Sequence, residues 1–370
     1  MIEMTKPYIG QEEIDAVVKV MKSGMLACGD VVTDFENQFT RYIAMEEGVA
    51  SCNGTTALHV ALLALGIGEG DKVLTTPFTF IASSNSILFN KSIPVFIDID
   101  PQTYLIDPDK LEAYLEMHYE PCMKAILVVH LFGLACDMPR VMKLAYKYNL
   151  KVIEDCAQSH GAEISGQKAG SFGDASSFSF YPTKNMTTGE GGITLFKHVP
   201  DADLGRKYIN HGRVDQYLHD VLGFNYRMTN IAAAIGIEQL KRVDGFNDLR
   251  RRNAQIYDEQ FKDVTFISTP FVKGGFKHVY HQYTVSLNGI NRKDLQIYMN
   301  KNGVGSSVVY PFSMNEQPFY EGVCEYESVS NAEITTKKVL SLPVHPGLTE
   351  SEVLKVVDVV KSYIKQCVKN

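Results

Sequence analysis

The chain has 370 residues, of which 45% are hydrophobic and 21% are charged. This length and composition predict a folded globular protein with two domains and an ample core. The formal net charge of −7 disfavours nonspecific binding to nucleic acids or to membrane surfaces. No apolar stretch is long enough to span a bilayer, and the first residues show no secretory pattern, so we expect a cytoplasmic protein.

The N-terminal part of the sequence begins with two amphipathic stretches, which predict helices over residues 11–22 and 32–42. A short strand, a polar glycine turn and a further helix follow over residues 48–65. The turn contains Gly54 and Thr55, and free N–H groups at such a helix start suit a phosphate. Small polar residues also cap helices that bind nothing, so the turn alone leaves both interpretations open.

Short apolar segments then alternate with helical ones. We expect strands at residues 73–76, 94–98, 125–132, 151–155, 176–180 and 192–196, and a helix at 138–149. This alternation predicts an α/β domain with a mostly parallel sheet. Ligands of such sheets bind beyond the carboxyl ends of the strands. Gly54, Phe80, Asp155 and Lys184 lie at or just beyond predicted strand ends, so we expect them to share a pocket.

The C-terminal part has a different pattern. An Ala/Ile/Leu-rich helix at 229–243 is followed by a charged segment, and we place a domain boundary there, with a large domain at 1–245 and a small domain at 246–370. The small domain is expected to be α+β. Its predicted strands are 280–287 and 304–310, and its predicted helices are 295–300 and 350–368.

The seven cysteines are scattered and form no C-x-x-C pair, which disfavours a disulfide framework, a zinc ribbon or an iron–sulfur cluster. His278 and His281 have the spacing of a metal-binding pair. They lack further ligands at useful spacing, so we interpret them as structural residues and expect no metal.

Lys184 follows a short apolar strand and precedes a polar, glycine-rich turn. A lysine at such a junction can be kept partly dry, and desolvation lowers the pKa of an amine. A neutral amine attacks carbonyl groups and forms Schiff bases. The alternative is a lysine on an ordinary exposed loop.

Five segments together resemble one protein family. They are residues 51–55, 77–80, 154–161, 179–192 and 223–230. In this order they are similar to the DegT/StrS-type sugar aminotransferases, a branch of the fold-type I, aspartate aminotransferase-like enzymes that use pyridoxal phosphate (PLP). The resemblance covers nearly the whole chain. It implies a PLP-dependent transferase fold and a transaminase activity.

The resemblance also implies roles for individual residues. Lys184 matches the lysine that forms a Schiff base with PLP and later moves a proton. Asp155 matches the carboxylate that pairs with the pyridine nitrogen. Gln158 matches a residue near the O3′ oxygen, and Phe80 matches the aromatic residue stacked on the ring. The remaining cofactor residues are those matching the phosphate-binding groups, namely Gly54, Thr55, Ser179 and, from the neighbouring subunit of a homodimer with shared sites, Asn225.

The expected substrates are a nucleotide-diphospho keto sugar and, as amino donor, L-glutamate. Arg213 and Arg227 are the candidate partners of the diphosphate, although either could form an ordinary surface ion pair. Residues 310–318 resemble a family segment that shapes the sugar pocket, and they contribute Tyr310 and Asn315. Asn315 stands where the family usually has histidine, which puts the identity of the sugar in doubt. Gln158 favours a 3-amino over a 4-amino product.

Two alternatives remain at this point. One is a keto-cyclitol aminotransferase, and the other is a PLP-binding regulatory protein without turnover. A related subgroup carries out dehydration and has histidine in place of the lysine, so Lys184 disfavours that reaction.

Overall fold

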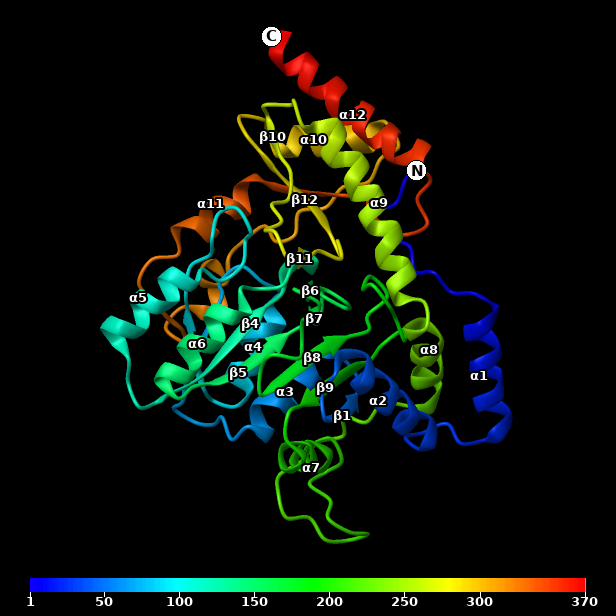
Figure 1. Ribbon diagram of the computed structural model, residues 1–370, viewed down its shortest axis with the longest axis vertical. Helices are drawn as coiled ribbons and strands as arrows, with labels where there is room; N and C mark the ends of the chain where they lie inside the picture. Colours follow the sequence, from blue (N-terminus) through cyan, green and yellow to red (C-terminus); the bar gives the residue numbers. More distant parts are fainter. Residues whose placement is uncertain (370) are drawn as a thin grey trace.

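The computed structural model of the protein describes residues 1–369, and an eight-stranded mixed sheet forms its centre (Figure 1). The strands follow the order β1 (Glu47–Ser51), β9 (Gly192–Phe196), β8 (Ala175–Ser179), β5 (Lys151–Asp155), β4 (Met123–Val129), β2 (Lys72–Thr75), β3 (Ile93–Phe96) and β13 (Glu325–Tyr326). From β8 to β13 all neighbours are parallel, whereas β9 is antiparallel to both β1 and β8. The predicted α/β fold with a mostly parallel sheet is therefore confirmed.

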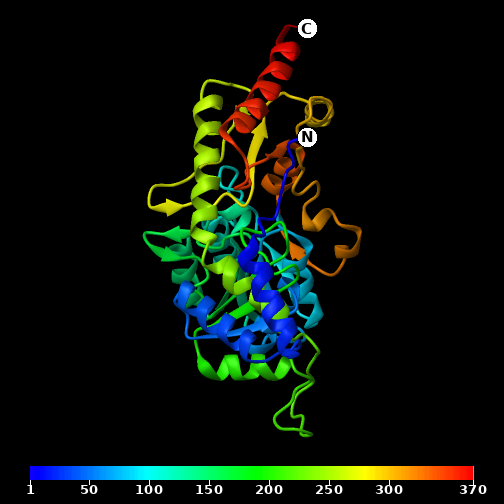
Figure 2. The same cartoon turned by 90° about the vertical axis from the view of Figure 1, so that its right-hand side faces the viewer.

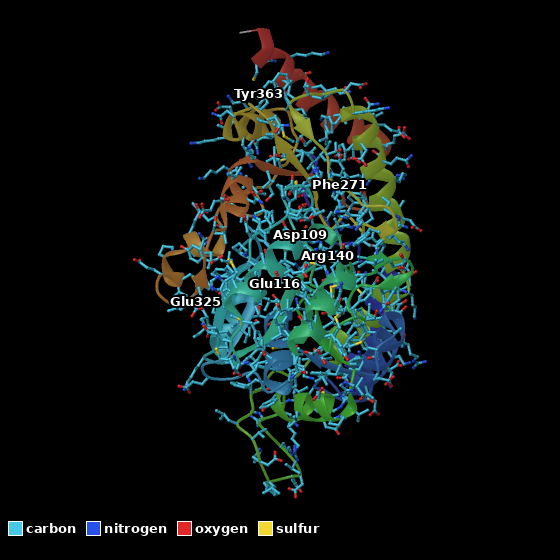
Figure 3. The ribbon with its side chains drawn as sticks, turned by 60° about the vertical axis from the view of Figure 1, so that its left-hand side comes forward. Asp109, Glu116, Arg140, Phe271, Glu325 and Tyr363 are labelled. Atoms are coloured by element: carbon cyan, nitrogen blue, oxygen red, sulfur yellow. The ribbon has the colours of Figure 1, made fainter. Side chains whose placement is uncertain are left out.

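Helices pack around this sheet. They are α1 (Gln11–Ser23), α2 (Asp30–Ile43), α3 (Gly54–Ala64), α4 (Ile81–Phe89), α5 (Pro108–His118), α6 (Met138–Tyr148), α7 (Val199–Tyr208) and α8 (Asn230–Leu240). Helix α3 is apolar on nearly all sides because it lies between β8, β9 and α7. Helices α5 and α6 lie side by side, and Arg140 of α6 forms an ion pair with Asp109 of α5 (Figure 3).

A smaller antiparallel sheet and its helices form the other end of the molecule (Figure 1). Its strands are β10 (Ile267–Ser268), β12 (Tyr283–Leu287) and β14 (Val339–Leu342). The helices of this part are α9 (Val243–Phe261), α10 (Arg292–Lys301), α11 (Ser330–Lys338) and α12 (Glu350–Lys369). Short antiparallel strands β6 (Glu163–Ile164), β7 (Gln167–Lys168) and β11 (Phe276–Lys277) form a third sheet. Single 3₁₀ turns occur at Leu131–Gly133, Met314–Glu316 and Pro318–Tyr320.

The part of the chain that the structure describes has two hydrophobic clusters. The larger one lies around the eight-stranded sheet, and the smaller one lies around the sheet of β10, β12 and β14. The smaller cluster includes Ile2, whose backbone N–H donates to the Gly303 carbonyl at 2.8 Å. The first residues therefore lie beside the C-terminal part of the chain (Figure 2). Helix α9 continues through the predicted boundary at residue 245, and the division of the chain at that position stays a prediction.

Some predicted elements differ from the observed ones. The prediction of a strand at 304–310 is wrong, because the backbone of this segment forms only isolated β-bridges, at Val304 and Ser307. The strand expected at 280–287 begins later, at Tyr283. Within residues 1–369, no helix combines the length and the apolar character needed to cross a lipid bilayer.

Candidate active site

A cavity of about 530 Å³ opens at the carboxyl edge of the large sheet. Strands β1, β5 and β8 run in the same direction, so their ends meet at this edge. Eight of the residues predicted from the sequence line the cavity, namely Gly54, Thr55, Phe80, Asp155, Gln158, Ser179, Lys184 and Tyr310. The expectation that strand-end residues share a pocket is confirmed for Gly54, Phe80, Asp155 and Lys184.

Asp155 is the last residue of β5, and its side chain is only 4% exposed. One carboxylate oxygen accepts the Ser83 hydroxyl at 2.7 Å, and the other accepts the Ala157 backbone N–H at 3.0 Å. Burial raises the pKa of Asp155, while these hydrogen bonds and nearby Lys184 oppose the rise. The carboxylate is thus held rigidly and is ready to pair with a cation that enters the cavity.

Lys184 follows β8 across a tight turn, in which its backbone N–H donates to the Tyr181 carbonyl at 2.9 Å. Burial lowers the pKa of Lys184 from 10.5 to about 8, and the negative charge of Asp155 works against this change. An appreciable fraction of Lys184 is therefore an uncharged amine near neutral pH. The structure contradicts the alternative of a lysine on an ordinary exposed loop.

This lowered pKa leads to a prediction for cofactor uptake. If Lys184 attacks the aldehyde of PLP, the rate of attack by the cofactor-free protein should rise roughly tenfold per pH unit below pH 8 and level off above it, because only the neutral amine reacts. Stopped-flow absorbance measures this rate. In Asp155→Asn the plateau should begin at a lower pH, because Asp155 raises the pKa of Lys184. A rate that climbs until pH 10 would show an ordinary exposed lysine.

The start of α3 forms one wall of the cavity. The Asn53 side chain caps the helix by accepting the Thr56 N–H at 2.9 Å. The N–H groups of Gly54 and Thr55 have no intrahelical partner at this position. A Cβ atom on Gly54 would lie 2.6 Å from the Cβ of Ser179, so only glycine lets the start of α3 approach the end of β8 so closely. Helix-start N–H groups beside a hydroxyl form a cradle for a phosphate.

Gln158, Tyr310 and Phe80 form a connected group on another wall. The Gln158 amide oxygen accepts the Phe132 N–H at 2.7 Å, which leaves its NH₂ group to donate to the Tyr310 hydroxyl at 3.0 Å. The Tyr310 ring lies 6.1 Å from the Phe80 ring, with an angle of 34° between the planes. Phe80 is 55% exposed, which is unusual for a phenylalanine of the core and leaves its ring available to a flat ligand.

Four predicted residues do not line this cavity. Asn225 is exposed and pairs with Asn210 in an isolated bridge. Arg213 is exposed and donates to the Asp215 carbonyl at 2.8 Å. Arg227 donates to the Asn210 side chain at 2.7 Å, and Asn315 donates to Glu333 at 2.8 Å. Arg213, Asn225 and Arg227 belong to one segment, which includes a loop that protrudes beside α7 (Figure 1).

Two further residues line the site or support it: Ser83, which the sequence analysis did not single out, and His281, which it interpreted as a structural residue. Ser83 lies on α4, four residues after Thr79, and the hydroxyls of the two are 2.8 Å apart. Thr79 lies just before α4, so the four-residue spacing of two hydroxyl side chains across the start of the helix was the available signal. His281 lines the cavity, and its Nδ1 lies 3.2 Å from the Asn185 amide oxygen. Burial lowers the pKa of His281 well below its ordinary value, so the ring is neutral.

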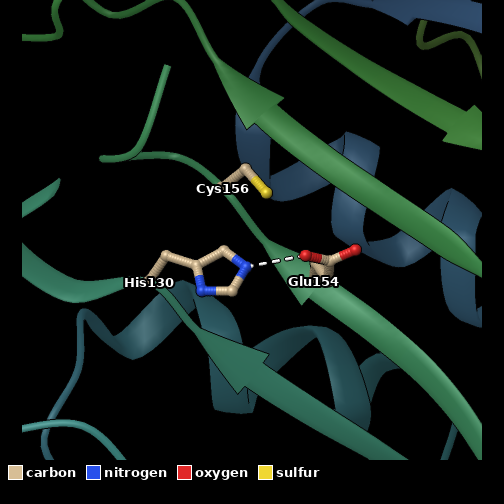
Figure 4. Close-up of side chains that lie close together, drawn as sticks. All are labelled: His130, Glu154 and Cys156. Carbon is tan, nitrogen blue, oxygen red and sulfur yellow. Dashed lines mark hydrogen bonds and ion pairs between the residues drawn. The ribbon is translucent and has the colours of Figure 1, made fainter. Parts of the chain in front are cut away.

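His130, Glu154 and Cys156 lie together at the ends of β4 and β5, where Glu154 and Cys156 flank Asp155 in the chain (Figure 4). Their ligand atoms are within 4.8 Å of one another, as in a metal site. However, Nδ1 of His130 accepts the Cys136 N–H at 2.9 Å, so Nε2 carries the proton and donates to Glu154 at 2.9 Å. Three backbone N–H groups also bind Glu154, each at 2.8 Å, from Gly170, Phe172 and Gly173. The ring nitrogens of His130 and the carboxylate oxygens of Glu154 are already hydrogen-bonded within the protein, so the cluster instead fixes the chain beside Asp155.

Glu154→Gln should therefore destabilise the protein. The side chain is fully buried, and an amide would direct N–H groups at donors that now bind a carboxylate. We expect the free energy of unfolding in denaturant titration to fall by about 3–5 kcal/mol. Exposed Glu46 offers a matched control, and Glu46→Gln should change this free energy by less than about 0.5 kcal/mol. A loss below about 1 kcal/mol for Glu154→Gln would contradict this interpretation.

The residues of the cavity fit PLP. The volume of the cavity lies within the range of small-molecule sites, roughly 300–1,000 Å³. The α3 start and Ser179 suit the phosphate, buried Asp155 suits a ring nitrogen that carries a proton, and Lys184 suits the aldehyde. A charged ring nitrogen would also compensate the cost of burying the Asp155 carboxylate.

Comparison with known proteins gives consistent matches over nearly the full chain. The model of the DegT/DnrJ/EryC1/StrS aminotransferase family matches residues 7–361. GDP-perosamine synthase of Caulobacter vibrioides is 37% identical, with 96% of each chain covered. UDP-N-acetyl-3-dehydro-alpha-D-glucosamine 3-aminotransferase of Acidithiobacillus ferrooxidans is 36% identical, covering 95% of this chain and 93% of the relative. The crystal structure of S. venezuelae DesV in complex with a ketimine intermediate superimposes with a TM-score of 0.91, at 31% identity, covering 95% of this chain and 94% of that one.

Proposed function

Because this chain belongs to the DegT/DnrJ/EryC1/StrS aminotransferase family, we propose that it transfers an amino group from L-glutamate to the keto group of a nucleotide-linked sugar. The protein is a PLP-dependent aminotransferase. The observation that carries the proposal is the convergence of Lys184, Asp155 and the α3 phosphate cradle on one cavity. The names of the relatives, which include UDP- and GDP-linked sugars, support the substrate class.

Bound PLP supplies an electron sink for negative charge at the substrate carbon. We assign the proton transfers at this carbon to Lys184 Nζ, whose pKa of about 8 lets the amine accept and return a proton near neutral pH. We assign Asp155 to hold the ring nitrogen in its protonated form. Gly54, Thr55 and Ser179 would bind the phosphate, and Phe80 would cover one face of the ring. Gln158 and Tyr310, which line the same cavity, would lie near the ring oxygen.

The nucleotide would bind at the open side of the cavity with help from a second subunit. Asn225, Arg213 and Arg227 do not line the cavity of their own chain, yet they occupy one continuous, largely exposed segment. We propose that in a two-fold dimer this segment reaches the partner's cavity, where Asn225 binds the cofactor phosphate and the arginines bind the diphosphate.

Mixing of inactive subunits tests the shared site. We expect Lys184→Ala and Asn225→Asp to be inactive alone, because the second change places a carboxylate beside the cofactor phosphate. A mixed dimer would contain one site in which both residues are intact. Denaturing and refolding an equal mixture should therefore restore about one quarter of wild-type turnover, since half of the dimers are mixed and each has one working site. Turnover that stays at the level of the separate variants would argue for unshared sites.

The substrate is tested by supplying the glutamate-treated enzyme with a panel of UDP- and GDP-linked 3-keto and 4-keto sugars. We expect one nucleotide sugar to be aminated, and Gln158 favours a 3-keto substrate. Amination of a keto-cyclitol instead would support the alternative substrate class. A protein that exchanges its amino group with glutamate but aminates neither class would overturn the substrate proposal.

A further inference from the structure

A second, much smaller cavity lies next to the active site and shares Thr183 and Lys184 with it. Its volume of about 10 Å³ is near the least that holds one water-sized species. Lys6, Lys184 and Arg250 contribute to its lining, and none of the aspartates and glutamates that the structure describes lines it. Three basic side chains thus meet around a space for a single small species.

Arg250 of α9 is the most unusual of the three. It is only 5% exposed, and among residues 1–369 it forms no salt bridge. Its Nη1 donates to the carbonyls of Tyr280 and His281 at 3.1 and 3.3 Å, while its buried Nε has no hydrogen-bond partner. Burial alone lowers the pKa of Arg250 to about 10. A buried, unpaired guanidinium is costly unless an anion compensates its charge.

The surrounding groups do not supply this anion. Burial lowers the pKa of His281 and of His345, and nearby Arg250 lowers both further, so these rings are neutral. The negative charge of Asp155 raises the pKa of Lys184. However, this carboxylate lines the main cavity and already accepts hydrogen bonds from Ser83 and Ala157. Glu352, the carboxylate near His345 and Lys6, binds the backbone and hydroxyl of Thr349.

We infer that this cavity is a binding site for one small monovalent anion, either a halide such as chloride or the carboxylate of a small acid, held between Lys6, Arg250 and Lys184. The anion accepts a hydrogen bond from the Arg250 Nε–H group, which otherwise has no partner. It also offsets the positive charges of Lys6, Lys184 and Arg250. The bound anion also favours the protonated, ammonium form of Lys184, so the protonation of Lys184 depends on the anion concentration in the medium. This inference concerns anion binding and does not depend on the sugar substrate.

Bromide provides a direct structural test. Crystals of the full-length protein with PLP, grown in sodium bromide, should show an anomalous peak within about 3.5 Å of Arg250 Nε and of Lys6 Nζ. In solution, chloride-35 NMR line broadening should saturate at millimolar chloride. Displacement of chloride by formate would identify carboxylates as occupants, whereas resistance to formate would identify a halide site. Absence of both the bromide peak and saturable broadening would overturn the inference and leave a cavity for water.

The variants are chosen so that folding does not obscure the result. Lys6 is exposed, and Lys6→Gln removes one charge of the site without emptying the core. Its chloride Kd should rise about tenfold, which corresponds to about 1.4 kcal/mol. Exposed Lys19 on α1 provides the matched control, and Lys19→Gln should leave the Kd unchanged. Equal broadening in the wild type and Lys6→Gln would contradict the proposed site even if Arg250 variants fail to fold.

Discussion

Lys184→Ala is expected to lower the rate of amino transfer from L-glutamate by at least about 10⁴-fold. The variant loses the amine that we assign to bind the cofactor aldehyde and to move the proton at the substrate carbon. Among the side chains that the structure describes, no other lysine lines the main cavity, so none of these is placed to substitute. The rate is measured as keto acid formed from glutamate, together with the visible absorption of the cofactor.

Two controls separate lost chemistry from lost folding. Lys197 is exposed at the end of β9, and Lys197→Ala should retain wild-type turnover. Added methylamine should restore part of the proton transfer in Lys184→Ala, because it enters the space vacated by the side chain. Borohydride treatment of the wild-type protein with PLP should leave the added mass on the peptide that contains Lys184. Turnover within tenfold of the wild type, or an adduct on another lysine, would remove Lys184 from the assigned role.

The central part of the site could be predicted because it depends on local signals. Turn residues after apolar segments mark strand ends, and in a parallel sheet these ends meet at one edge. Gly54, Asp155 and Lys184 therefore converge even though long stretches of sequence separate them. This prediction did not need the order of the strands or the direction of β9. The apolar pattern of β9 does not show that the strand runs antiparallel to β8.

Other features depend on contacts that sequence periodicity does not describe. Residues 304–310 have the composition of a strand, yet they form only isolated bridges. The matched motifs identify Arg213, Asn225 and Arg227 without saying which subunit's cavity they reach. In the sequence, Arg250 is one residue of a charged helix. Its burial beside Lys184 follows from the packing of α9 against the turn that contains His281. These features arise from tertiary contacts between segments that are distant in the sequence.

Asp155→Asn should lower kcat for the reaction with glutamate by about 10³-fold, which corresponds to about 4 kcal/mol of lost stabilisation. Asparagine has nearly the same shape and still accepts the Ala157 N–H, so the change removes mainly a negative charge. Without that charge the ring nitrogen loses its proton, and the ring accepts electrons less readily. KM should change much less than kcat, because Asp155 is assigned to the cofactor and not to the amino acid.

Ser83→Ala separates the charge of Asp155 from its positioning. This variant keeps the carboxylate but removes the hydroxyl that binds it at 2.7 Å, and we expect kcat to fall only about tenfold. Asp203→Asn, on an exposed part of α7, is the matched control for loss of a carboxylate and should have no effect. If Asp155→Asn and Ser83→Ala reduced kcat equally, orientation and not charge would be the contribution of Asp155. If both retained wild-type kcat, the cofactor ring would have to bind away from β5, and the assignment of the cavity walls would be wrong.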